Sequence, residues 1–314
     1  MNPQTTGALR KPEAGVAKTV EALLSRLIDY AGLFPPAALD MRSAVTHYDS
    51  YLRSEHSWIL GRFILPTARL NEFDEALGRL PESHSKPWAL SALVGANPEA
   101  DVARIVAFNA RTSSVGNGRS AVVESLEVKA ECPADVARVA AIIPRELTAY
   151  FEIALAEHEA ECINAIAECG RRAKIRTGGE SADKFPESPR VIEFVRLCAD
   201  ANVPFKATAG LHHPIRSVHR LSYKPDSPSA MMHGFLNVFL AAAFVRAGLE
   251  TGAAVDLLEE QSPAATQFDS EGVTWRKHRL RWREVAAARR NFSISFGSCS
   301  FTEPVNDLRS LGLL

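Results

Sequence analysis

Single charged side chains interrupt several short apolar runs of the sequence that have β-strand character. Glu152 lies in TAYFEIAL, Lys174 in RAKIRTG and Lys206 in VPFKATAG. Glu127 and Lys129 interrupt the run SLEVKA in the same way. Side chains alternate between the two faces of a strand, so each charged group shares its face only with every second residue. We therefore expect two lysines and at least one carboxylate to converge on one side of neighbouring strands.

A lysine in such surroundings can act as a nucleophile. Burial and a neighbouring cation both lower the pKa of a lysine, which converts an inert ammonium into a nucleophilic amine. The amine condenses with an aldehyde or ketone to a Schiff base, and a carboxylate with a water molecule can shuttle the protons. Lys174 and Lys206 both lie shortly before glycines, at the ends of their strands, which favours chemistry. The alternative is a buried salt-bridge network that only ties strands together.

Small residues follow the last three predicted strands. The segments are Thr177-Gly178-Gly179, Ala209-Gly210-Leu211 and Gly297-Ser298-Cys299-Ser300. Small side chains let backbone N–H groups approach an anion, and Arg62 and Arg176 could act as forks for a phosphate or carboxylate. The candidate anion- or substrate-binding residues are Arg62, Arg176, Thr177, Gly178, Gly179, Thr208, Gly210, Gly297, Ser298 and Ser300.

Two adjacent histidines, His212 and His213, follow the seventh predicted strand. Neighbouring side chains of an extended chain diverge, so at most one of them faces the site, and His212 is the candidate acid or base. No HxH or HExxH spacing is present, and we predict no metal. No GxGxxG or P-loop opens a predicted helix, and no cofactor is expected.

The elements that position these residues alternate between β-like and helical runs with short connections. This alternation predicts parallel strands joined by right-handed crossovers, and eight such units favour an α/β (β/α)₈ TIM barrel. The outer face of a barrel strand is covered by helices, so the charged residues should point inward. The predicted strands are 57–66, 87–95, 121–130, 148–155, 172–178, 203–210 and 292–301, with a weaker one at 27–34.

The 314 residues exceed what a simple barrel needs. We expect a single domain over 17–314, a disordered N-terminus over 1–16 and an insertion over 217–291 between strands seven and eight. The insertion contains an apolar helix, a second helical run and the polar segment FDSEGVTWRKHRLRW. It could form a small hairpin that lids the barrel, or pack on a partner subunit in a homo-oligomer.

Composition excludes several classes of protein. Hydrophobic residues make up 46% of the chain and charged residues 23%, with a net charge of −1, which argues against nucleic-acid or membrane partners. The N-terminus lacks an apolar signal region, and the five scattered cysteines form no CxxC pair, which favours a soluble cytoplasmic protein. Trp275 and Trp282 lie in a basic run and could stack on bases, but the neutral total charge favours a solvated helix face with tryptophan anchors.

The pattern Lys174-x-x-Thr177-Gly178, followed 32 residues later by Lys206-x-x-x-Gly210, resembles the Schiff-base barrel of the deoxyribose-phosphate aldolases and related class I aldolases. The resemblance implies that Lys174 forms the imine, that Lys206 lowers its pKa and that Glu127 relays protons. The match is partial, because Arg176 replaces a small polar residue of the family pattern.

Three functions follow as hypotheses. The first is a lyase that acts through a Schiff base on Lys174 on a small carbonyl compound carrying a phosphate or carboxylate. The second is a non-covalent isomerase or decarboxylase, or a metal-assisted lyase, that uses the lysines and His212 as acid, base or electrostatic groups. The third is a non-catalytic binding or assembly protein, for which each lysine should pair with a carboxylate and no open pocket should lie above them.

Overall fold

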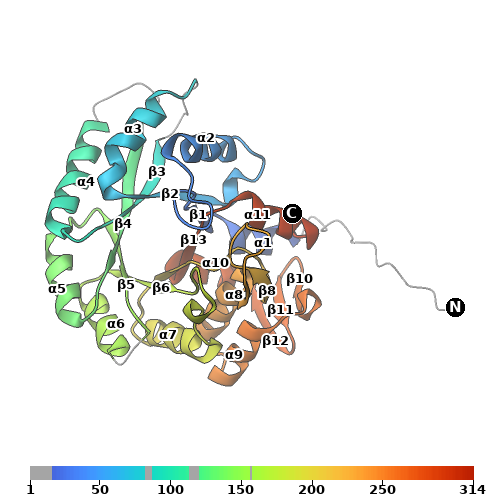
Figure 1. The fold of residues 1–314 in the computed structure, drawn as a ribbon. Helices are drawn as coiled ribbons and strands as arrows, with labels where there is room; N and C mark the ends of the chain where they lie inside the picture. The colour runs from blue at the N-terminus through green and yellow to red at the C-terminus, as the bar shows by residue number, and fades with distance from the viewer. Residues whose placement is uncertain (1–15, 82–86, 113–119, 156–157) are drawn as a thin grey trace.

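The computed structural model describes residues 16–81, 87–112, 120–155 and 158–314, and its centre is a closed barrel of eight parallel strands (Figure 1). Around the barrel the strands follow the order β1-β13-β7-β6-β5-β4-β3-β2. Helices alternate with these strands along the chain, so the prediction of a (β/α)₈ TIM barrel is confirmed. The strands are β1 (Ile28–Tyr30), β2 (Leu60–Pro66), β3 (Trp88–Leu93), β4 (Ala121–Lys129), β5 (Thr148–Glu152), β6 (Arg172–Arg176), β7 (Phe205–Thr208) and β13 (Ser293–Ser298).

Every barrel strand lies inside one of the eight predicted runs but is shorter than the run. At β7 the causes are visible at both ends. Pro204 precedes the strand, and Ala209 and Gly210 follow it with φ of 63° and 73°, a left-handed turn that ends the extended backbone. These residues form the loop that the site uses.

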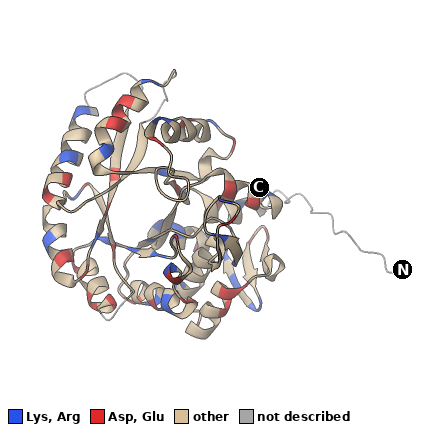
Figure 2. Cartoon of the chain, in the orientation of Figure 1, with Lys and Arg blue, Asp and Glu red and all other residues tan. Residues whose placement is uncertain are grey.

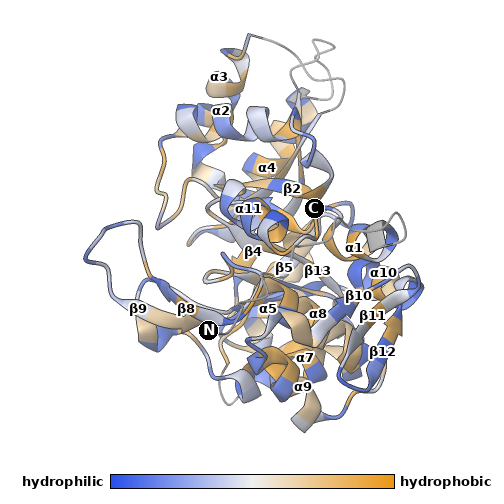
Figure 3. Cartoon of the chain, turned by 90° about the vertical axis from the view of Figure 1, so that its right-hand side faces the viewer, coloured by the Kyte–Doolittle hydropathy of each residue, from blue (hydrophilic) through white to orange (hydrophobic). Residues whose placement is uncertain are grey.

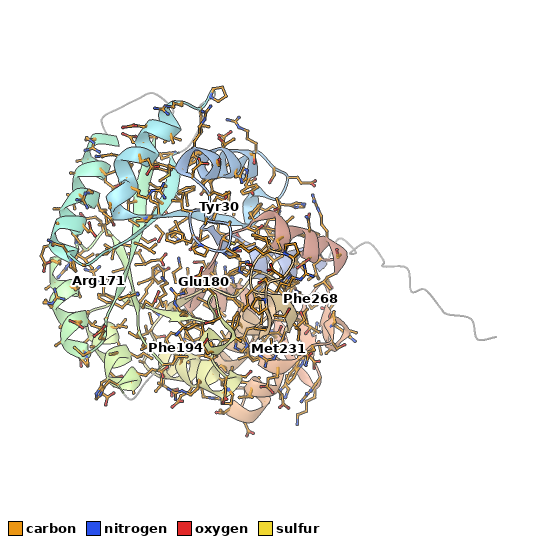
Figure 4. All side chains as sticks on the ribbon, in the orientation of Figure 1. Tyr30, Arg171, Glu180, Phe194, Met231 and Phe268 are labelled. Atoms are coloured by element: carbon orange, nitrogen blue, oxygen red, sulfur yellow. The ribbon has the colours of Figure 1, made fainter. Side chains whose placement is uncertain are left out.

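Helices cover the outside of the barrel through apolar faces. In α7, Phe194 packs on Phe205 of β7 with ring centroids 5.5 Å apart, and Figure 4 labels Phe194 among the outer helices. Asp40 accepts a hydrogen bond from the Ser43 N–H at 2.8 Å and so caps α2. The outer helices are α2 (Met41–Leu52), α3 (Leu70–Gly78), α4 (Pro98–Thr112), α5 (Pro133–Ile142), α6 (Glu159–Glu168), α7 (Ser188–Asp200), α8 (Phe235–Arg246), α10 (Trp282–Asn291) and α11 (Thr302–Ser310).

The segment between β7 and β13 contains both helices of the barrel and additional elements outside it. The helices α8 and α10 pack against β13 as part of the barrel wall. A two-stranded hairpin and a three-stranded sheet are additional, and Figure 3 shows them at opposite ends of the barrel. The additional elements are β8 (Ser217–Arg220), β9 (Ser229–Met232), α9 (Thr251–Glu259), β10 (Thr266–Phe268), β11 (Gly272–Trp275) and β12 (His278–Arg281).

The polar segment FDSEGVTWRKHRLRW contains β11 and β12, which form a sheet with β10, and this sheet contacts α1 (Val16–Leu24). The β8–β9 hairpin lies at the other end of the barrel, inside the predicted insertion 217–291, for which a small hairpin over the barrel is one of the two expectations. Trp275 is fully buried, and its Nε1–H donates to Glu260 Oε2 at 3.3 Å. Trp275 therefore anchors the sheet to the barrel and has no face available for a nucleic-acid base.

Arg289 of α10 connects two distant segments of the chain at the α1 end of the barrel. Its guanidinium is buried and donates to the carbonyl oxygens of Leu23, Ser25, Ser293 and Ile294. Burial lowers the pKa of Arg289 to about 9. One side chain thus satisfies backbone carbonyls before β1 and at the start of β13.

Other predictions concern the surface and the termini. Residues 1–15 of the predicted disordered segment lie outside the described residues, and α1 begins at Val16. No helix in the described ranges is long and apolar enough to cross a membrane. All five cysteines are free. Acidic and basic residues are interspersed along the outer helices in Figure 2, as the net charge of −1 leads one to expect.

Candidate active site

Two buried lysines and three carboxylates form one ion-pair network inside the barrel. The Lys206 ammonium on β7 donates to Asp29 Oδ2 on β1 at 2.7 Å and to Glu127 Oε1 on β4 at 2.6 Å. The Lys174 ammonium on β6 donates to Glu127 Oε2 and to Glu152 Oε2 on β5, both at 2.7 Å. The Glu127 carboxylate therefore bridges the two lysines, one oxygen to each.

Buried hydroxyl groups complete the network. Ser91 donates to Glu127 Oε1 at 2.8 Å and accepts from Ser125 at 2.9 Å. Ser295 donates to Asp29 Oδ2 at 2.7 Å. A buried polar network is stable only when its members are satisfied, and these serines supply donors that the lysines alone do not.

The electrostatics hold the network in its ionised form. Burial disfavours the Glu127 carboxylate, but the two ammonium groups outweigh burial and hold its pKa well below the usual range. Burial also disfavours the Lys206 ammonium, but Asp29 and Glu127 outweigh it and raise the pKa of Lys206 above its usual value. The expectation that burial and a second cation lower the pKa of the lysines is wrong for Lys206, because two carboxylates contact its ammonium.

A cavity of about 1170 Å³ lies at the carboxyl ends of the strands. Lys174, Glu127 and Glu152 line it, whereas Lys206 and Asp29 lie beneath its floor. Phe34-Pro35-Pro36 form part of its wall, and Glu180, near the middle of the view in Figure 4, also borders it. The volume is ample for a small organic molecule.

Ten of the fifteen predicted site residues line this cavity, and five lie around it. Lys206 lies below the floor, and Thr177 is fully buried with its hydroxyl donating to the Ala209 carbonyl at 2.8 Å. The residues that line the cavity are Glu127, Glu152, Lys174, Arg176, Gly178, Gly179, Thr208, Gly210, His212 and Gly297. The residues that do not are Arg62, Thr177, Ser298, Ser300 and Lys206.

The glycine loops after β6 and β7 touch each other. A Cβ on Gly178 would lie 2.8 Å from the Gly210 Cα and 2.7 Å from Phe185 Cε1. A Cβ on Gly210 would meet the same Phe185 atom at 2.7 Å, and Gly210 also has a positive φ. These contacts require glycine at both positions, and both backbones border the cavity.

The Ser298 and Ser300 hydroxyls at the end of β13 and the Arg62 guanidinium bind other protein groups and do not line the cavity. Ser300 accepts from the Glu303 N–H at 3.1 Å and so starts α11. Ser298 accepts from the Ser300 N–H at 3.4 Å. The Arg62 guanidinium pairs with Glu124 Oε2 at 3.1 Å, nearer the amino ends of the strands than Glu127.

His212 faces the cavity and His213 does not, as the divergence of neighbouring side chains predicts. His213 pairs with Asp307 Oδ2 at 2.7 Å and stacks on His219. Burial lowers the pKa of His212, but Cys299 and Glu303 outweigh burial and raise it to about 9. No group of His, Cys, Asp or Glu side chains within the described ranges has the geometry to hold a metal ion.

Sequence reasoning left two parts of this site unassigned. The sequence analysis does not assign Asp29 to a site, although a carboxylate inside the apolar run LIDYAGLF, within the predicted strand 27–34, is the same signal that indicated Lys174 and Lys206. Leu221 and Met232 of the β8–β9 hairpin line the cavity, and nothing in their local sequence indicates this contact.

Comparison with known proteins adds no functional information. No protein-family model matches the chain, and no curated protein sequence matches it.

Proposed function

We propose that the protein is a lyase of the class I aldolase type, in which Lys174 forms a Schiff base with a small carbonyl compound carrying a phosphate or carboxylate. One observation carries the proposal. Of the two lysines joined through Glu127, only Lys174 borders the cavity, and Glu152 beside it borders the cavity as well. A nucleophile with an adjacent carboxylate that can exchange protons with solvent is what imine formation requires.

The bond changes balance as follows. Lys174 passes a proton to Glu152, and its amine attacks the carbonyl carbon. The carbonyl oxygen takes up protons and leaves as water, which gives an iminium ion. A hydroxyl group on the carbon two positions from the iminium carbon then loses its proton to a carboxylate. The bond between that carbon and its neighbour breaks, the electron pair of this bond moves to the iminium nitrogen, and the first carbonyl product leaves. The resulting enamine takes a proton on carbon, and water releases the second carbonyl product from Lys174.

The remaining residues fit positioning roles. Lys206 is fully buried and acts through Glu127, whose orientation and charge it fixes. Arg176 is 49% exposed on its side chain, and its Nε lies 3.5 Å from Glu152 Oε1, so its guanidinium can turn to an anionic substrate group. The backbones at Gly178 and Gly210 offer a close approach for the same group.

Borohydride trapping tests the proposal. Sodium borohydride is added to the protein with a panel of small aldehydes and 2-oxo acids, with and without a phosphate. We expect a mass gain equal to the carbonyl compound less one oxygen atom, located on the peptide that contains Lys174. The Lys174→Met variant should give no adduct, whereas Lys184→Met, an exposed lysine that also lines the cavity, should react like the wild type. An adduct that persists in Lys174→Met contradicts the proposal.

A specific observation favours a second candidate function. The Lys174 ammonium contacts two carboxylates, and a paired cation at the edge of the cavity suits a non-covalent isomerase or decarboxylase. In that case Lys174 stabilises developing negative charge, and His212 exchanges the proton. Turnover of a carbonyl substrate that borohydride does not inhibit would support this function over the lyase.

A purely structural role for the network fits less well. The hypothesis of a binding or assembly protein requires each lysine to be paired, which is the case, but also requires that no open pocket lie above them. The cavity above Lys174 does not meet that second requirement.

A further inference from the structure

A second set of reactive groups borders the cavity at the end of β13. Cys299 is buried, with 5% of its surface exposed, and lines the cavity. Its Sγ lies 3.9 Å from His212 Nδ1 and 3.7 Å from the Tyr223 hydroxyl. Both distances are within the range of hydrogen bonds to sulfur, so the thiol has two polar partners from different segments of the chain.

The imidazole beside Cys299 has a second polar neighbour. The same Nδ1 atom of His212 lies 3.5 Å from Glu303 Oε2, so the imidazole lies between the sulfur and a carboxylate. Glu303 and Cys299 outweigh the effect of burial and raise the pKa of His212 to about 9. A cation next to a cysteine stabilises the thiolate, which is the nucleophilic form.

The other cysteines have no comparable surroundings. Burial raises the pKa of the Cys162 and Cys198 thiols, and the charged groups that act on them are acidic. Cys132 and Cys169 are half-buried, and neither lines the cavity. The four therefore serve as internal references for Cys299 in one and the same protein sample.

We propose that Cys299 is a reactive cysteine, activated by the His212 side chain beside its sulfur, that small uncharged electrophiles such as hydroperoxides modify when they enter the cavity. With hydrogen peroxide the thiolate attacks one oxygen atom, the S–O bond forms and the O–O bond breaks. Sulfur is oxidised to a sulfenic acid and the peroxide is reduced. The departing hydroxide takes the proton of His212 and leaves as water. The step does not involve Lys174 and does not depend on the proposed lyase function.

Alkylation rates of the five cysteines test the proposal without any substitution. The native protein is treated with iodoacetamide between pH 5.5 and 8.5, and each cysteine peptide is quantified by mass spectrometry. We expect Cys299 to react about tenfold faster than Cys132 at pH 6.5, because an ordinary thiol is only about 1% ionised there. Its rate should stay nearly constant from pH 6.5 to 8.5, whereas the rate of Cys132 should rise steeply. A Cys299 rate at or below that of Cys132, or a parallel rise with pH, overturns the proposal.

A variant and a second probe complete the test. His212→Gln keeps a hydrogen-bonding side chain but removes the charge, and we expect it to slow Cys299 alkylation at pH 6.5 at least fivefold while the other four rates stay unchanged. Hydrogen peroxide followed by dimedone should label Cys299 first in the wild type. Labelling of Cys132 or Cys169 before Cys299 contradicts the proposal.

Discussion

At the scale of single residues, the Glu127 carboxylate determines how this site works. Each of its oxygens receives one lysine ammonium, so it links the lysine that borders the cavity to the lysine beneath it. Removing ions from water is costly, and a buried pair is tolerated only where the remaining hydrogen bonds are satisfied. Ser91 meets this need at Glu127, and Ser295 meets it at Asp29.

Lys206 should therefore contribute strongly to stability. The substitution Lys206→Met leaves the Asp29 carboxylate buried without its ammonium partner, and we expect a loss of about 3–5 kcal/mol in the free energy of unfolding, measured by urea denaturation. The double variant Lys206→Met, Asp29→Asn removes both charges and should be less destabilised than the sum of the two single variants. Additive effects would show that the two groups do not interact.

At the scale of elements, the pattern of apolar and charged residues predicts the positions of the barrel strands. The apolar runs locate all eight barrel strands, because a strand buried on both faces is apolar throughout and an inward charge stands out against it. Asp29 carries the same signal, but it lies in the weakest of the eight predicted strands, of which only three residues form β1. The local sequence does not show which part of the predicted insertion forms the β8–β9 hairpin, because this hairpin packs on Phe185, a residue from the loop after β6.

The hairpin should be an independently opening cover of the cavity. Leu221 is 8% exposed and packs with Met232 in a small cluster of its own, separate from the main core. Leu221→Ala should increase amide hydrogen exchange in residues 217–232 by about tenfold or more, with no change in the barrel strands. Val218 is 61% exposed on the same hairpin, and Val218→Ala is the matched control, expected to leave exchange unchanged. A uniform increase over the whole barrel after Leu221→Ala would show that hairpin and barrel open together.

At the scale of the whole molecule, the net charge of −1 conceals two buried groups whose titrations oppose each other. Burial lowers the pKa of His233 to about 4, and its Nδ1 accepts from Arg216 while its Nε2–H donates to the Pro186 carbonyl. Burial raises the pKa of Glu159 to about 7, although Arg190 lies 3.0 Å away. Burial thus favours the neutral form of both groups.

The two groups should cancel in the pH dependence of stability between pH 4.5 and 6.5. In this window the unfolded chain binds a proton at His233 that the folded chain does not, so this group makes stability rise with pH. The folded chain binds a proton at Glu159 that the unfolded chain releases, so this group makes stability fall with pH. Each slope approaches 1.4 kcal/mol per pH unit in magnitude, so the contributions of these two groups to the free energy of unfolding should nearly cancel. His233→Gln, which can keep both hydrogen bonds, should reveal the fall, and Glu159→Gln should reveal the rise, in urea denaturation at pH 4.5, 5.5 and 6.5. If both variants show the same pH dependence as the wild type, neither group is buried in its neutral form.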